Sequence, residues 1–237
     1  RQMCIRDRRN AVAHIINYDS MAKIIGNGST PGAAPFPPSA NLGYDTIANK
    51  ATTDVAKADQ ILTQAGYAKN ANGVYAKDGK ELSLTLAVWG KDTSMYEEIQ
   101  QELKQAGINV TLKKLQSPDE VDTLGTDGFD LVERNVITMS TNDPYWFLSL
   151  FYKSGAKANV GGYTNPQVDA LIDQLSVTFD QNERSNIAKQ AQQILVDDVA
   201  DIYLLYPSAT VVSTNKVKNV PAHPIDYYLL TKDSTIE

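Results

Sequence analysis

Residues 82–112 read LSLTLAVWGKDTSMYEEIQQELKQAGINVTL and contain two kinds of apolar pattern in succession. Apolar residues alternate with polar ones from Leu82 to Leu86, which is typical of a half-buried strand. From Met95 to Ala106 they recur every three or four residues, which predicts a helix, and Gly107 provides the residue that commonly ends one. A second strand is expected over 108–112. Strand, helix and strand in this order predict a parallel crossover unit.

Several elements are expected before this unit. Helical spacing predicts one helix over 9–16 and a second, short helix that begins at Asp19 and stops at Gly26. Residues 26–43 are rich in glycine and proline, which forbids a regular helix and predicts a long ordered strap. A helix capped near Asp54 should follow, and then a hairpin over 74–82 with an Asp-Gly turn.

The second half of the chain continues the alternation of strands and helices. A short strand is expected over 129–132, and Pro144, Pro166 and Asp180 lie where three further helices should begin. The runs Ile202–Tyr206 and Val211–Ser213 are predicted as strands, the first of them buried. The fold class is therefore α/β, with helices expected on both faces of a parallel sheet. Such sheets bind ligands beyond their strand ends, here in the loops after Leu86 and Val132.

Composition excludes several classes of protein. The chain has 237 residues, of which 42% are apolar and 21% charged, so it can form a globular core. Its net charge is −6 and its lysines and arginines are not clustered, which makes nucleic acid an unexpected partner. Cys4 is the only cysteine, and the two histidines, His14 and His223, are far apart, so neither a disulfide nor a familiar metal motif can be assembled. No resident cofactor or protein-bound metal is expected.

No catalytic motif supports an enzyme. The sequence lacks GxSxG, Walker-type and dinucleotide-binding motifs, and Ser140 has no histidine nearby in sequence. The alternative that stays open is a hydrolase acting on a polar substrate, which would need a nucleophile or paired carboxylates near Ser140. A third possibility is a chaperone-like module that uses an aromatic surface.

Some residues admit both a structural and a binding role. Asp143 and Pro144 form a good helix start, and the same loop could present Asn142, Asp143 and a helix N-terminus to a polar ligand. Trp89 lies at a strand end and is expected to line a cleft, whereas Trp146 has the helical spacing of a core residue. Arg134 ends a strand, so it should either pair with an acidic residue or hold a ligand carboxylate.

Together, several stretches resemble the extracytoplasmic solute-binding proteins of peptide/nickel-type ABC transporters. The similar segments follow one another in the family's order over nearly the whole chain. They are RNAVAHIINYD (9–19), the strap at 32–38, AKADQILTQAGY (56–67), LKQAGINV (103–110), NDP (142–144), GYTNP (162–166) and AQQIL (191–195) followed by IYL (202–204).

This resemblance implies a periplasmic-binding-protein-like fold of type II, of which the chain would be a C-terminal fragment. Residues 9–205 would form mainly the second α/β lobe, and residues 206–237 a crossover and return toward the first. Residues 1–8 depart from the family and are predicted to be a non-native junction that includes Cys4. Family members close two lobes around a ligand like a hinge.

The ligand class is left between two alternatives. Peptide-binding members place an acidic residue shortly before the Asp-Pro pair, where this chain has Met139, Ser140 and Thr141. The ending over 224–233 is similar to the nickel and metallophore branch. The ligand is thus expected to be a short peptide or a nickel or other metal chelate, with carboxylates bound by Arg134.

The resemblance implies a non-enzymatic role in import. The protein would act as a monomer outside the cytoplasm, in the periplasm or lipid-anchored to the outer face of the membrane, and deliver its ligand to an ABC permease. The candidate ligand-binding residues are Trp89, Arg134, Asn142, Asp143, Trp146 and Tyr163.

Overall fold

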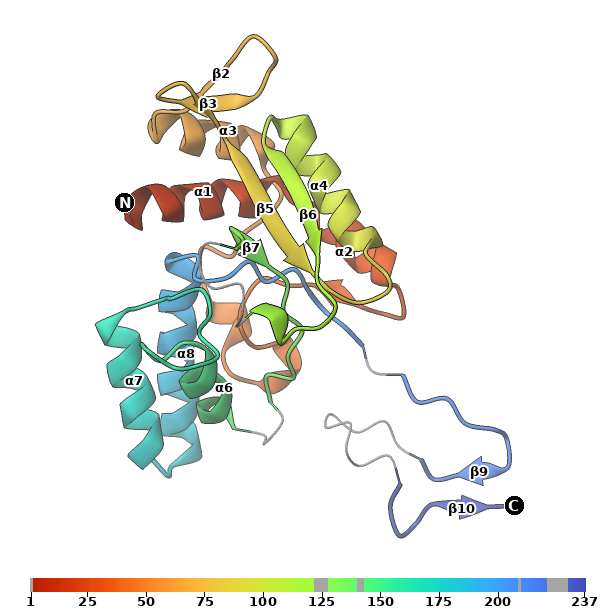
Figure 1. The fold of residues 1–237 in the computed structure, drawn as a ribbon. Helices are drawn as coiled ribbons and strands as arrows, with labels where there is room; N and C mark the ends of the chain where they lie inside the picture. Colours follow the sequence, from red (N-terminus) through yellow and green to blue (C-terminus); the bar gives the residue numbers. More distant parts are fainter. Residues whose placement is uncertain (1, 122–127, 140–142, 209, 221–229) are drawn as a thin grey trace.

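The computed structural model describes residues 2–121, 128–139, 143–208, 210–220 and 230–237 (Figure 1). The helices are α1 (Gln2–Ile15), α2 (Tyr18–Ile25), α3 (Val55–Gln64), α4 (Ser94–Ala106), α6 (Pro144–Phe151), α7 (Pro166–Val177) and α8 (Gln181–Asp197), with short 3-10 helices η1 (Pro38–Ala40) and η2 (Tyr44–Thr46). The strands are β1 (Thr30–Pro31), β2 (Ala68–Lys69), β3 (Tyr75–Lys77), β4 (Lys80–Glu81), β5 (Ser83–Val88), β6 (Asn109–Lys114), β7 (Leu131–Val132), β8 (Leu205–Tyr206), β9 (Val217–Lys218) and β10 (Thr235–Ile236).

The main sheet has the order β6-β5-β7 and is parallel throughout. Leu86 in the central strand lies opposite Leu112 of β6 on one side and Leu131 of β7 on the other. Helix α4 connects β5 to β6, and Gly107 ends it with a positive φ of 103°. The predicted strand, helix and strand crossover is confirmed. Since all three strands run the same way, their carboxyl ends meet at one edge of the sheet.

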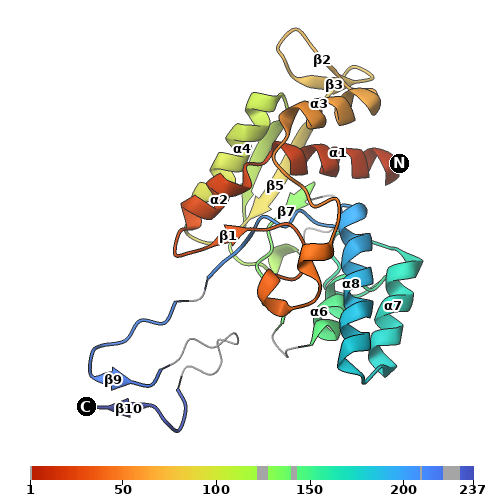
Figure 2. The ribbon, with the colours of Figure 1, turned by 180° about the vertical axis from the view of Figure 1, so that it is seen from behind.

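The two faces of this sheet are covered differently. Leu84, Leu86 and Val88 point into a core shared with α1, α3 and α4, and Figure 2 shows these helices from their own side of the sheet. On the other face, Ser83 is exposed and only Ala87, near the carboxyl end, is fully buried. The expectation of helices on both faces is therefore wrong for the described residues. The second face is covered only where the strands end, by loops and by the helical turn at 120–121.

A second core belongs to the helices α6, α7 and α8, which lie below the sheet in Figure 1. Phe36 and Leu42 of the strap pack into this core, and Gln192 of α8 fastens the strap by bonding the Phe36 amide and the Leu42 carbonyl. The glycine- and proline-rich segment is thus an ordered strap, as predicted. In the described part of the chain, no helix has the length and apolar character needed to cross a membrane.

The last predicted strands are only partly present. Of the run 202–206, only Leu205 and Tyr206 form β8, which pairs antiparallel with Thr30 and Pro31 of the strap. No strand forms over 211–213, and Val212 is 88% exposed, so this prediction is wrong. The hairpin of β9 and β10 extends away from the sheet and helices (Figures 1 and 2).

Candidate functional site

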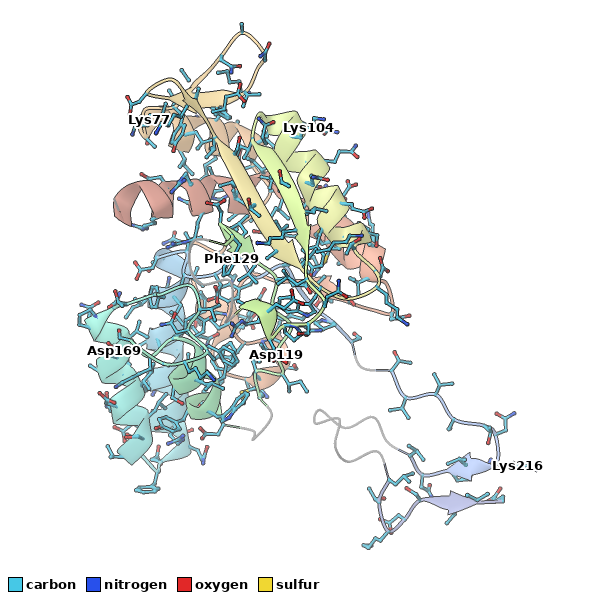
Figure 3. All side chains as sticks on the ribbon, in the orientation of Figure 1. Lys77, Lys104, Asp119, Phe129, Asp169 and Lys216 are labelled. Carbon is cyan, nitrogen blue, oxygen red and sulfur yellow. The ribbon has the colours of Figure 1, made fainter. Side chains whose placement is uncertain are left out.

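A cavity of about 330 Å³ opens where the strands of the main sheet end. The ends of β5 and β7, the loop after β6, helix α6 and the loop that follows α6 all contribute to its wall, and Figure 3 labels Asp119 just beyond the carboxyl ends of β5 and β6. This is the position at which parallel α/β sheets bind ligands. The lining residues are Trp89, Pro118, Asp119, Val121, Val132, Arg134, Asn135, Leu150, Lys157, Ala158 and Val160.

Trp89 forms part of the apolar wall of this cavity. It directly follows β5, is half-buried, and packs beside the cluster of Ala87, Leu115 and Val121. The Trp89 amide donates to the Glu133 carboxylate at 2.9 Å, which holds the end of β5 against the end of β7. Trp89 thus lies in the cavity wall, where its position at a strand end predicts a cleft residue.

Arg134 lines the same cavity and lies two residues after the end of β7. Its Nη1 donates to the Ala158 carbonyl at 2.9 Å, and its guanidinium carbon lies over the Phe151 ring, 4.7 Å from the ring centre. Among the described residues it has no acidic partner, so of the two roles considered for Arg134, pairing within the fold is not what the structure shows. The side chain is exposed and lines the cavity.

Asp143 serves as the N-cap of α6. It accepts a hydrogen bond from the Tyr145 amide at 2.8 Å, and Pro144 occupies the first helical position, which confirms the helix start predicted from the sequence. The same carboxylate forms an ion pair with Arg184 of α8. Asp143 is therefore occupied by contacts within the protein. Asn142 lies outside the described residues.

Trp146 is not the core residue that its helical spacing predicts. It is 38% exposed and does not line the cavity. Its ring meets the ring of Phe151 edge-on at 6.0 Å, and Phe151 is the aromatic residue that contacts the Arg134 guanidinium. In an eight-residue helix only one side can face the core, and Phe147 and Leu148 take that side.

Tyr163 lies in a polar network away from the cavity. Its hydroxyl donates to Asp198 at 2.7 Å, and Asn165 donates to the same carboxylate at 2.8 Å. Burial, with the nearby Asp198 charge, raises the pKa of Tyr163 well above its ordinary value. The tyrosine therefore stays protonated as a donor. The structure thus brings together Trp89 and Arg134, but not Tyr163.

Three polar residues of the cavity are missing from the sequence-based set. Asp119 lies in the loop after β6, Asn135 follows Arg134, and Lys157 lies in the loop after α6. The strand-end rule could have found the first two, because both follow a parallel strand. Lys157 follows a helix and has no such signal. Together they give the cavity both acidic and basic groups.

A second, smaller cavity lies at α1. The cavity has about 30 Å³ and lies between α1 and residues 201–203, with His14, Asp201 and Tyr203 in its wall. That volume holds one or two water molecules rather than a solute. Among the described residues, no three His, Cys, Asp or Glu side chains gather in a group that could hold a metal ion.

Comparisons with known sequences identify relatives of this chain. The nickel-binding protein NikA of Staphylococcus aureus is 29% identical over 236 residues, which are 97% of this chain and 45% of that protein. The probable D,D-dipeptide-binding periplasmic protein DdpA of Escherichia coli is 28% identical over 226 residues, covering 92% of this chain and 41% of that protein. The chain thus spans less than half the length of these relatives.

Solved structures show the same fold. A nickel ABC transporter protein from Bacillus halodurans superposes with a TM-score of 0.80 at 25% identity, covering 98% of this chain and 49% of that one. S. aureus NikA in complex with Ni(L-His)2 gives 0.75 at 26% identity, covering 98% and 48%. The fold is that of periplasmic solute-binding proteins. The sequence profile described as "Bacterial extracellular solute-binding proteins, family 5 Middle" matches residues 3–159, which is more than half of the chain. The chain belongs to the bacterial extracellular solute-binding proteins of family 5.

Proposed function

We propose that this chain supplies one wall of the binding site of an ABC importer's solute-binding component. The ligand is a small metal chelate or a short peptide, captured outside the cytoplasm and delivered to a membrane permease. The observation that carries this proposal is the cavity at the strand ends, which places Trp89 and Arg134 in one wall. Relatives named for nickel and dipeptide binding support the choice of ligand. They give no support to a hydrolase, the alternative considered from the sequence.

The groups in the wall fit an organic ligand with carboxylates. A guanidinium can bind a carboxylate through two parallel hydrogen bonds, and Arg134 has four N–H groups besides the one bonded to Ala158. Asn135 adds an amide, and the Trp89 ring adds a flat apolar surface for rings or chains. Asp119 can accept from an amine. A metal chelated by amino acids and a short peptide both carry this combination of carboxylate, amine and apolar parts.

Closure of a second lobe over this wall would complete the site. Excluding water lowers the effective dielectric constant, which strengthens each charge-assisted hydrogen bond between Arg134 and the ligand. Ligand binding would therefore favour the closed state, and the closed state would report occupancy to the permease. No covalent chemistry takes part.

Replacing Arg134 by alanine tests this proposal in the full-length protein as its gene encodes it. Native mass spectrometry of the protein purified from its host first identifies the bound ligand, and calorimetry then measures its affinity. Loss of a charge-assisted contact predicts an affinity about 10- to 100-fold lower. Lys80→Ala, which removes the same charge from the exposed hairpin, is the matched control and should bind as the unmodified protein does. An unchanged affinity in Arg134→Ala would remove Arg134 from the site.

A further inference from the structure

Arg134 lies at the end of a row of aromatic rings. Its guanidinium carbon is 4.7 Å from the centre of the Phe151 ring. The Phe151 ring in turn meets Trp146 edge-on at 6.0 Å and Phe147 at 5.1 Å with a tilt of 43°. Phe147 is 5% exposed, so this end of the row is anchored in the core of α6, α7 and α8.

The contact with Phe151 restricts the Arg134 side chain before a ligand binds. A long charged side chain at an exposed strand end is mobile, and ordering it upon ligand binding costs conformational entropy. An aromatic face attracts a guanidinium and also restricts it, because planar groups stack in few orientations. The hydrogen bond to the Ala158 carbonyl is a second contact that restricts the guanidinium.

We propose that Phe151 is a positioning residue for Arg134. Its ring holds the guanidinium in one orientation beside the cavity, so that the arginine is already ordered when the ligand arrives. Trp146 and Phe147 hold the Phe151 ring in turn, which gives Trp146 a role in binding although it does not line the cavity. The inference rests on the proposed function in one respect only, namely that Arg134 contacts the ligand.

The orientation of Arg134 can be measured without knowing the ligand. Phenylglyoxal reacts with both terminal nitrogens of a guanidinium, so a stacked and hydrogen-bonded arginine reacts slowly. The rate at Arg134 is followed by mass spectrometry of the peptide that contains it, in the full-length protein. Phe151→Leu should raise this rate about two- to fivefold, the factor that corresponds to one cation–π contact at an exposed site.

Two further variants separate positioning from general stability. Phe151→Tyr keeps the ring and should restore the slow rate, which a merely structural role for residue 151 would not require. Phe179→Leu makes the same change at an 88% exposed phenylalanine between α7 and α8, and should leave the rate at Arg134 unchanged. An equal rate in the unmodified protein and in Phe151→Leu would overturn the proposal, as would a Phe151→Tyr rate as fast as that of Phe151→Leu.

A binding measurement then separates this inference from the proposed function. With nickel and L-histidine as the probe, Phe151→Leu should weaken binding by about the same factor, and the effect should vanish when Arg134 is already alanine. An equal loss with and without Arg134 would overturn the positioning role. Failure of the unmodified protein to bind this probe would count against a nickel chelate as the ligand, while the phenylglyoxal rates would still decide the role of Phe151.

Discussion

Replacing Arg184 by methionine should destabilise the bundle of α6, α7 and α8 by about 3 kcal/mol. The Arg184 side chain is 13% exposed and joins all three helices. It donates through Nε to the Asp143 carboxylate at 2.9 Å, at the start of α6, and through Nη1 to the carbonyls of Leu175 and Thr178, at the end of α7. Its removal leaves the Asp143 carboxylate and both carbonyls without these partners.

The magnitude follows from the burial of the partners. Breaking a buried ion pair by deleting one member costs about 3–5 kcal/mol, because an uncompensated charge stays behind. The Asp143 side chain is 31% exposed, so water replaces part of the lost interaction and the cost falls to the lower end, about 3 kcal/mol. Lys153→Met is the matched control. Its partner Asp173 is 70% exposed, and such surface pairs contribute less than about 1 kcal/mol.

Hydrogen exchange measured by mass spectrometry checks this prediction in the full-length protein. In Arg184→Met, peptides from α6, α7 and α8 should lose protection by about 100-fold, the equivalent of 3 kcal/mol. Peptides from β5 and α4 belong to the other core and should be unchanged. A loss of protection in Arg184→Met no larger than that in Lys153→Met would refute the reasoning.

Two other changes have expected outcomes. Burial raises the pKa of Tyr206 to about 12, against about 10 in an unfolded chain, so the unfolded state loses this proton first and the stabilisation disappears as the pH rises from 10 to 12. Tyr206→Phe removes the hydrogen bonds to Ala34 and should lower the free energy of unfolding by about 1–2 kcal/mol at pH 8. Measured by urea unfolding, the stability of this variant should fall less steeply at alkaline pH than that of the unmodified protein, and an equally steep fall would contradict this. Gly107→Ala should cost more than about 2 kcal/mol in thermal unfolding, because its Cβ would lie 2.5 Å from the Gly73 carbonyl. Gly90→Ala, also at positive φ but with open space around it, should cost about 1 kcal/mol, and equal costs would show that the close approach is unimportant.

The helices and the crossover could be predicted because their signals are local. Asp54, Asn165 and Asp180 each accept a hydrogen bond from an amide two or three residues further on, so the cap and the helix start are encoded within one turn. The hairpin turn at Asp78 and Gly79 has positive φ at both residues, as an Asp-Gly pair favours. The resemblance to a known family then supplied the fold as a whole.

The missed features depend on distant parts of the chain. A short run such as Val211–Ser213 forms a strand only if a partner strand lies beside it, and none is paired with it in the described chain. The hydrogen bond from Tyr163 to Asp198 could not be predicted, because the two residues are 35 positions apart. Trp146 likewise has the spacing of a core residue, but the position of α6 against α7 decides which side is buried.

In the candidate site, too, local features could be predicted and contacts with distant residues could not. Trp89 and Arg134 could be nominated from the sequence, because a parallel strand carries its functional residues at its carboxyl end. The residues that contact Arg134 could not be predicted from the sequence, since Phe151 and Ala158 are 17 and 24 positions away.

A crystal structure of the full-length protein, purified from its host with the solute it carries, tests the central claim most directly. We predict that the solute occupies the cavity at the strand ends, with a carboxylate bound to Arg134 and an apolar part against Trp89. A solute bound elsewhere, with this cavity filled only by water, would contradict it.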